Sequence, residues 1–286
     1  MKNIKTRSTT SSSARLFDPL NNFFFYKIFG EKGDEIQLLG FINAVLGKAG
    51  DDKFVSVEIL ENKNFIAEIM SGKSCSLDVR AQLQNGTMVN IEVQLQDEHN
   101  MDRRSLFYLS KEYVRRLKAG KNYIELQNVI AINILDYDFP KTRGFYSCFH
   151  LREDTERDII LTDALEIHFI NMVKYRKQGK ERLDDPLCRW LTWFNRNSPP
   201  ELLEEVVKMD AAIQTADARM SYLTMSEEEM DTYERIQKAE MGRVSAVSYL
   251  LRKEKLQIAR NLLAEGSTPE FVQKTTGLSL EEIAKL

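Results

Sequence analysis

The sequence predicts a mixed α/β domain followed by a helical C-terminal region. Apolar residues recur at helical spacing in 23–47, strand-like runs flank Asn85-Gly86, and a β-rich apolar run spans 128–139. Alternation with a period of two indicates strands, and a period near 3.6 indicates helices. After residue 180 or so the strand-like runs cease and long helical patterns follow, so the β elements belong to the first part of the chain.

The N-terminal residues 1–16 are polar and are expected to form a flexible tail. Two helices are then predicted around Gly30, and Asp34 is a plausible N-cap of the second one. Residues 54–60 alternate as a strand, and 61–75 are expected to be an irregular connection.

Asn85-Gly86 between two alternating runs predicts a β-hairpin. A two-residue turn would place Val79 opposite Glu92. A three-residue loop, with Gly86 left-handed, would instead place Asp78 opposite Glu92. The hydrophobic pattern favours the three-residue loop, because a one-residue slip would mix apolar and polar side chains on each face.

A helix over 102–118 that stops at Gly120 is predicted next, and 128–139 is predicted to be a central strand buried on both faces. The apolar stripe of that helix is expected to hold Leu106, Leu109, Tyr113 and Leu117. Further strands are expected near 148–154 and over 165–173.

The remaining chain reads as helices at 186–195 and 199–223, a long charged helix to residue 266, and two short helices around Gly277. Trp190 and Trp193 lie three apart on a predicted helix and are interpreted as core residues. The expected division is a tail (1–16), an α/β core (17–178), a helical region (179–265) and a small helix-turn-helix-like module (266–286).

The composition is that of an ordinary globular protein, with 43% hydrophobic and 29% charged residues. No apolar run approaches the roughly 18 residues that a membrane span needs. The three cysteines have no paired spacing, which fits a reducing compartment, so we expect a cytoplasmic protein. His99, His150 and His168 show no metal-ligand spacing and are expected to be surface or core residues.

Glu92 and Gln94 lie two apart on a predicted strand and therefore share a face. One interpretation is a solvent-facing polar stripe, the commonest fate of such residues. The other is a metal site. Two carboxylates, Asp78 and Glu92, facing each other across a hairpin repel unless a cation lies between them. Their hard oxygens suit Mg²⁺ or Mn²⁺.

The pattern of Asp78 followed by Glu92-Val93-Gln94 resembles the PD-(D/E)XK nuclease motif, with glutamine at the usual lysine position. The chain is similar in particular to the recombination-promoting nuclease (Rpn) and transposase branch of that superfamily. The segments that carry this likeness are NNFFFYKIFG (21–30), LLGFINAVLG (38–47), LDVRAQLQNGTMVNIEVQ (77–94), residues 103–139 and the closing GLSLEEIAKL.

The resemblance implies a restriction-endonuclease-like fold and a Mg²⁺-dependent endonuclease that cuts DNA, linked to recombination or mobile elements. Asp78 and Glu92 would bind the metal, and Gln94 would align the attacking water. The branch usually has an acidic residue at the position of Asn22, which offers a weaker, neutral oxygen, and Asp18 one turn earlier is a possible substitute.

The basic segment 103–121 is either a solvated face, which is the more frequent case, or a DNA surface whose arginines and lysines track phosphates. The residues expected to contact DNA are Arg104, Tyr108, Lys111 and Arg115. The acidic last helix fits a phosphate groove poorly, so the C-terminal module is interpreted as a packing or interaction module. The C-terminal helices could join subunits. The alternative to a nuclease is a catalytically impaired DNA-binding or interaction module on the same fold.

Overall fold

The computed structural model describes residues 18–33, 35–60, 79–115, 122–178, 182–222 and 227–286. The chain divides into two compact units, Met1–Leu223 and Thr224–Leu286, and each is described by itself. The predictions for Asp34, the connection 61–75, Asp78, Leu117 and Gly120 fall outside the described residues.

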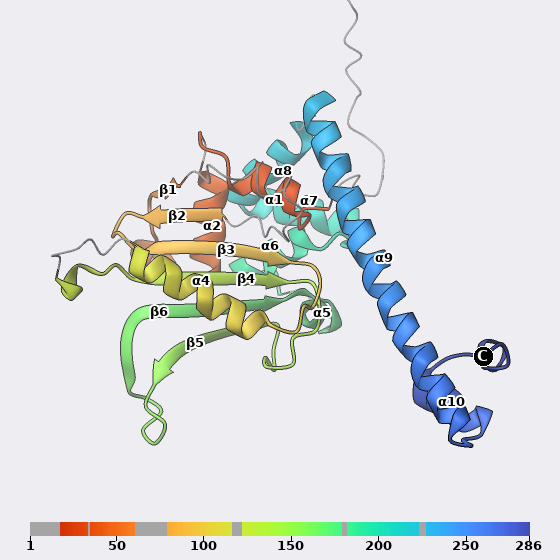
Figure 1. The fold of residues 1–286 in the computed structure, drawn as a ribbon. Coiled ribbons are helices and arrows are strands. Elements are labelled where there is room, and N and C mark those ends of the chain that lie inside the picture. The colour runs from red at the N-terminus through yellow and green to blue at the C-terminus, as the bar shows by residue number, and fades with distance from the viewer. Residues whose placement is uncertain (1–17, 34, 61–78, 116–121, 179–181, 223–226) are drawn as a thin grey trace, which may run out of the picture. The chain divides into compact units, whose positions relative to one another are not determined.

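The first unit is built on a six-stranded mixed sheet in the order β1-β2-β3-β4-β6-β5 (Figure 1). The pairs β3–β4 and β4–β6 are parallel, and the other neighbours are antiparallel. The strands are β1 Val57–Ile59, β2 Val79–Leu83, β3 Met88–Gln94, β4 Val129–Leu135, β5 Tyr146–Arg152 and β6 Ile160–Asn171. The predicted restriction-endonuclease-like α/β architecture is thereby confirmed.

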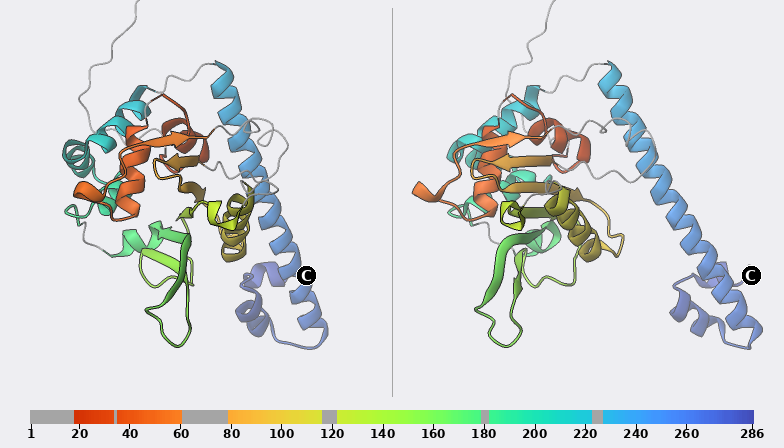
Figure 2. Two further views of the ribbon diagram at one scale, coloured as in Figure 1. Left: turned by 90° about the vertical axis from the view of Figure 1, so that its left-hand side faces the viewer. Right: turned by 60° about the vertical axis from the view of Figure 1, so that its left-hand side comes forward.

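Helices cover both faces of this sheet, so the unit has three layers (Figure 2). One face is covered by α4 (Met101–Arg115), which packs against β4 and β6. The helices of the other layer are α1 Asn22–Phe29, α2 Ile36–Val45, α6 Pro186–Phe194, α7 Pro200–Met209 and α8 Ala211–Tyr222. Short elements complete the unit, namely α5 Met172–Lys177, η1 Gly50–Asp52 and η2 Tyr123–Glu125.

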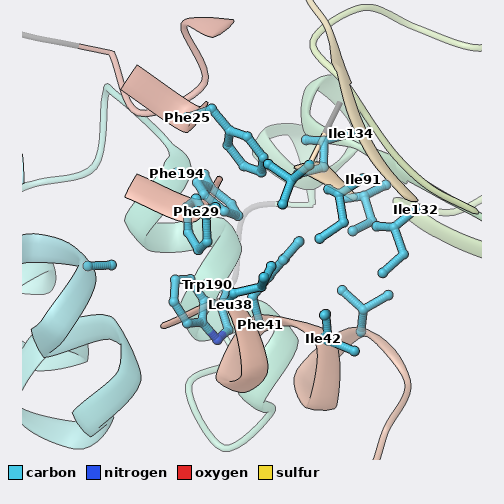
Figure 3. Close-up of a cluster of buried hydrophobic side chains, with 14 of the residues drawn as sticks. Phe25, Phe29, Leu38, Phe41, Ile42, Ile91, Ile132, Ile134, Trp190 and Phe194 are labelled. Carbon is cyan, nitrogen blue, oxygen red and sulfur yellow. The ribbon is translucent and has the colours of Figure 1, made fainter. Parts of the chain in front are cut away.

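The main hydrophobic core lies between the sheet and the helices α1, α2 and α6 (Figure 3). Ile91 and Ile132 meet Phe29, Phe41 and Trp190 there. Trp190 and Trp193 are fully buried, as predicted. The boundary expected after residue 178 does not separate two cores, because α6 to α8 contribute to the same cluster as the strands.

The hairpin of β2 and β3 has the predicted register. Val79 pairs with Ile91 and Ala81 with Val89, and Leu83 N–H donates to Thr87 O at 2.9 Å across a three-residue loop. Gly86 in that loop has φ +88°, which favours glycine because a side chain would clash there.

Helix α4 differs from the predicted apolar stripe. Leu106 is 54% exposed, whereas Met101, Ser105, Leu109 and Glu112 are buried. The buried face includes a polar position because Glu112 pairs with Arg80 of β2, with Arg80 Nη2 2.7 Å from Glu112 Oε1. The predicted stripe was based on apolar residues alone. It therefore left out Glu112, whose ion pair with Arg80 helps to orient the helix.

The second unit joins the long helix α9 (Glu227–Ala264) to the short helices α10 (Pro269–Thr276) and α11 (Leu280–Ile283). Gly277 ends α10 with φ +71°, and Ser279 and Glu282 form a capping box on α11, so the turn lies where the sequence predicts it. A small core of Ala259, Val272, Leu278 and Ile283 joins the three helices. None of the helices in the described ranges is long and apolar enough to cross a membrane.

Candidate active site

The candidate site lies toward the carboxyl end of β3. Glu92 and Gln94 alternate with Ile91 and Val93, which pack in the main core. Successive side chains of a strand point to opposite faces. Glu92 and Gln94 therefore face the layer of α4, and contacts with that helix bear this out.

Glu92 is almost completely buried, with 1% of its surface exposed. Gln94 is 8% exposed, so a solvent-facing polar stripe is the wrong interpretation of this strand. The reason is that β3 is an internal strand with β2 on one side, parallel β4 on the other, and helices on both faces. A buried carboxylate needs a compensating charge or hydrogen bond.

Arg104 of α4 supplies this charge. Its Nε donates to Glu92 Oε1 at 2.6 Å, and its Nη1 lies 3.5 Å from Glu98 Oε2. Burial alone would lower the pKa of Arg104, but the adjacent Glu92 carboxylate outweighs it and the pKa is raised. The guanidinium also lies over the ring of Tyr108, 5.4 Å from its centroid.

The four residues predicted to bind DNA therefore occupy two different settings on α4. Arg104 and Tyr108 pack on each other, and the Arg104 side chain is only 13% exposed. Lys111 and Arg115 are exposed, and Arg115 lies 3.7 Å from Glu112. Lys111 and Arg115 are the more exposed of the four, and Arg104 and Tyr108 are partly buried.

The start of α1 approaches the same end of the sheet. The Asp136 N–H, directly after β4, donates to Gln94 O at 3.0 Å. Asp18 lies near Asp136 in turn, and burial together with that carboxylate raises the pKa of Asp18 even though the Leu20 N–H bond lowers it. Asp18, just before α1, therefore lies near the carboxyl ends of β3 and β4.

Asn22 is the first residue of α1, and its Oδ1 is buried without a hydrogen-bond partner among the described residues. An unpaired buried carbonyl oxygen calls for a ligand such as water or a cation. Asp18 lies in a turn before the helix, where its Oδ1 accepts from the Leu20 N–H at 2.9 Å, so it is not on α1 as the substitute role supposed.

Sequence reasoning missed Tyr137, which follows β4. Its hydroxyl is buried without a hydrogen-bond partner among the described residues. The pKa of Tyr137 is raised mainly by burial, and the nearby carboxylates of Asp97 and Glu92 raise it further. No sequence signal marks this residue, since it becomes part of the site only through the parallel pairing of β3 with β4.

The candidate donor atoms are oxygens of a carboxylate and a neighbouring phenol, from Glu92 and Tyr137, and the buried amide oxygen of Asn22. Hard oxygen donors fit Mg²⁺ or Mn²⁺ rather than a soft metal ion. The unpartnered Asn22 Oδ1 is the observation that makes this fit specific. Asp78, the other predicted metal ligand, lies outside the described residues.

The mixed sheet, with a buried carboxylate and an amide two residues apart near the end of an internal strand, is the arrangement of a PD-(D/E)XK nuclease fold. Residues 19–249 match the model of the family described as PD-(D/E)XK nuclease family transposase. Residues 252–286 match the C-terminal HTH domain of the Rpn/YhgA-like nuclease family. Because the first match covers most of the chain, the chain belongs to the PD-(D/E)XK nuclease family transposases. Comparisons with curated proteins and with solved structures found no match.

Proposed function

We propose that the chain is a Mg²⁺-dependent endodeoxyribonuclease that acts on DNA in recombination or on mobile elements. The observation that carries the proposal is the buried Glu92 carboxylate, held by Arg104 at 2.6 Å, with Gln94 on the same face of the strand. A fully buried carboxylate is costly to keep, so its presence at a strand end favours a functional role.

Asp78 and Glu92 are proposed as the metal ligands. Asp78 directly precedes Val79, which pairs with Ile91, so extending that register by one residue would bring Asp78 opposite Glu92. Arg104 occupies Glu92 Oε1, and the ligand role would fall to Oε2. Asn22 Oδ1 would add a neutral oxygen. When bound, the ion would supply charge to stabilise the phosphoryl oxygens and lower the pKa of a water.

The proposed role of Gln94 is to orient the water that attacks the phosphate. Its Nε2 donates to Gln96 O at 3.2 Å. The amide oxygen could then accept a hydrogen bond from the attacking water. An amide carries no charge and takes up no proton, so Gln94 would align the nucleophile without acting as the base. The hydroxyl of Tyr137 would donate to a phosphate oxygen near Glu92.

The alternative function is a DNA-binding or interaction module on the same fold that no longer cuts. The observation that favours it is the Arg104–Glu92 ion pair, because a guanidinium already neutralises the carboxylate that a metal would need. Asn22 also favours this alternative, because a neutral amide is a weaker metal ligand than a carboxylate. Under this alternative the chain binds DNA without a requirement for Mg²⁺.

The test is nicking of supercoiled plasmid by the purified full chain in Mg²⁺, Mn²⁺ or EDTA, with Asp78→Asn and Glu92→Gln beside the wild type. Glu58→Gln is the matched control, since Glu58 is an exposed carboxylate on β1. The proposal expects metal-dependent nicking that both site variants lose and the control keeps. Nicking that survives in Asp78→Asn would refute the assigned site.

The absence of nicking with either metal would favour the alternative. Asn22→Asp then becomes the informative variant, because an added charge at a ligand position strengthens a hard-cation site roughly tenfold or more. Recovery of nicking in Asn22→Asp would identify the neutral ligand as the cause of the lost activity.

The exposed side of α4 is proposed to contact the DNA backbone through Lys111 and Arg115. Neutralising a phosphate releases a counterion, so each contact adds about 0.9 to the slope of log affinity against log salt concentration. Lys111→Ala is expected to lower that slope by about one. Lys48→Ala, on the far side of the sheet from α4, should leave it unchanged.

A further inference from the structure

A second cluster of metal-ligating side chains lies at the β5–β6 edge of the sheet, away from the candidate active site. Cys148, Glu166 and His168 each place one ligand atom within 4.8 Å of the others. His150 lies next to this group of three, with Nε2 3.2 Å from Cys148 Sγ. Neither the predicted nuclease function nor the family comparison uses these residues.

Strand pairing creates the cluster. Cys148 pairs directly with His168 across the antiparallel β5–β6 ladder. The ladder is irregular between Phe149 and Leu151, and contacts rather than alternation place the other two residues: His150 lies against Cys148, and Glu166 lies against His168. The linear sequence hides this set, because residues 148–150 and 166–168 are separated by the loop between the strands. His168 is 3% exposed and is therefore a core residue, as the sequence predicts. Its place in this cluster is what the spacing of the histidines did not show.

The hydrogen bonds of His168 define its tautomer. The Tyr146 hydroxyl donates its single proton to Val45 O at 3.0 Å, so it can only accept from His168 Nδ1, also at 3.0 Å. Nδ1 therefore carries the proton, and Nε2 is the nitrogen turned toward the cluster. A second hydrogen bond that fixes the ring in this way is typical of metal-ligating histidines.

His168 Nε2 faces a carboxylate oxygen, which can only accept, and a thiol, which is a weak donor. It lies 3.2 Å from Glu166 Oε2 and 3.8 Å from Cys148 Sγ. In a neutral ring this nitrogen has a lone pair, and a carboxylate oxygen also offers only lone pairs. The two atoms can approach so closely only if a proton or a metal cation lies between them. A proton at this nitrogen would make an ion pair of His168 with Glu166, whereas a metal cation would also engage the Cys148 sulfur 3.8 Å away.

We propose that Cys148, His150, Glu166 and His168 bind a divalent transition-metal ion of the Zn²⁺ class across β5 and β6. Bond lengths of about 2.3 Å to sulfur and about 2.0 Å to nitrogen or oxygen, in a tetrahedron, separate the ligand atoms by about 3.3–3.6 Å. Three of the six separations among these ligands are 3.2, 3.2 and 3.8 Å, close to this range, and the ligand atoms of Cys148, Glu166 and His168 all lie within 4.8 Å of one another. One thiolate and one carboxylate balance the charge of a divalent ion, which suits a half-buried place.

The ligand types separate this site from the candidate nuclease site. Sulfur and imidazole select Zn²⁺-like ions, whereas the oxygens at Glu92 suit Mg²⁺. The charged groups around the cluster are Lys48 beside Glu166 and Arg152 beside Cys148. With four protein ligands the site would hold β5 onto β6 and play a structural part.

His150 is the least constrained ligand. Its Nδ1 is buried without a hydrogen-bond partner among the described residues, so its ring lacks the support that Tyr146 gives to His168. Missing outer support typically lowers metal affinity by about 10–100-fold. Loss of His150 should therefore weaken binding less than loss of Cys148 or His168.

The test is Co²⁺ titration of the metal-free full chain, followed in the visible and near-ultraviolet, and then displacement by Zn²⁺. The expected result is one equivalent with tetrahedral visible bands and a thiolate-to-cobalt charge-transfer band. Cys148→Ser should abolish the charge-transfer band, while Cys188→Ser, a change at a buried thiol outside the cluster, should keep it. Glu92→Gln should also keep it, which excludes binding at the nuclease site.

Competition with a chromophoric zinc chelator measures the affinities. His168→Gln is expected to weaken Zn²⁺ binding by at least about a hundredfold and His150→Gln by about tenfold. The exposed His99→Gln is the matched control and should not change it. Circular dichroism shows that each variant is folded. A wild type without a charge-transfer band, or one unchanged in Cys148→Ser, would overturn the proposal and leave an ion pair of His168 with Glu166.

Discussion

Replacing Arg104 by methionine tests whether the Glu92 carboxylate depends on its partner. Methionine keeps most of the apolar stem and removes the guanidinium. Glu92 is 1% exposed and the Arg104 side chain 13% exposed, so this is a buried ion pair with a distance of 2.6 Å. Breaking such a pair from one side costs about 3–5 kcal/mol, because the remaining charge is buried without compensation.

Taking the lower end of that range, because Arg104 keeps some contact with solvent, we expect a loss of about 3 kcal/mol. In a unit of this size each kcal/mol lowers the melting temperature by about 2–4 °C, so the expected shift is roughly 6–12 °C. Thermal and urea unfolding followed by circular dichroism measure both quantities. The control is Arg103→Met, an exposed neighbour on the same helix, which should change stability by no more than about 0.5 kcal/mol.

The double variant Arg104→Met with Glu92→Gln completes the cycle. If the single change destabilises because it strands a charge, removing that charge should recover most of the loss. A cost in Arg104→Met no larger than in Arg103→Met would refute the reasoning. So would a double variant that is less stable than Arg104→Met alone.

Three further changes probe the fold and the charge of the site, each by unfolding. Gly86→Ala should destabilise the hairpin by about 1–2 kcal/mol, because φ at this position is +88°. The control is Gly242→Ala, in an open stretch of α9, which should be neutral or stabilising. Gly40→Ala should cost about 1–3 kcal/mol, since its Cβ would clash with Ala212 of α8; no loss would contradict that packing. Asp18 has a raised pKa, so its ionisation opposes folding once the pH exceeds its unfolded value of about 3.9. Asp18→Asn, which can keep the Leu20 bond, should raise the melting temperature at pH 7 and leave it unchanged near pH 3; an equal gain at both would exclude the carboxylate as the cause.

The hairpin shows what a sequence can predict about a site. Its register follows from alternation and from a glycine that adopts a positive φ, and both are local properties of a short stretch. The pairing of Val79 with Ile91 matches that prediction. The same reasoning put Glu92 and Gln94 on one face, where the structure has them.

The residues that surround Glu92 could not be predicted from the sequence near it. Arg104 meets Glu92 only because the β3–α4 loop folds the helix back over the sheet, and Tyr137 comes near through a parallel pairing of distant strands. The prediction of a DNA contact for Arg104 came from the basic segment 103–121 and from the family resemblance. The ion pair with Glu92 depends on the burial of β3 on both faces, a tertiary property that neither of them contains.

The two functional hypotheses differ in what neutralises Glu92. In a module that only binds DNA, Arg104 alone neutralises Glu92, and the Arg104–Glu92 ion pair is permanent. For a nuclease, Arg104 holds one carboxylate oxygen and keeps the side chain in place, while a second cation must approach the other oxygen. The carboxylates of Asp97 and Glu98, near Tyr137 and Arg104, would then attract cations and repel a bare phosphate, whereas Asp136 is paired with Arg176. Binding of DNA at the strand end that depends on a divalent ion would therefore follow from the charge of this end itself, and binding that ignores the ion would place the DNA elsewhere on the molecule.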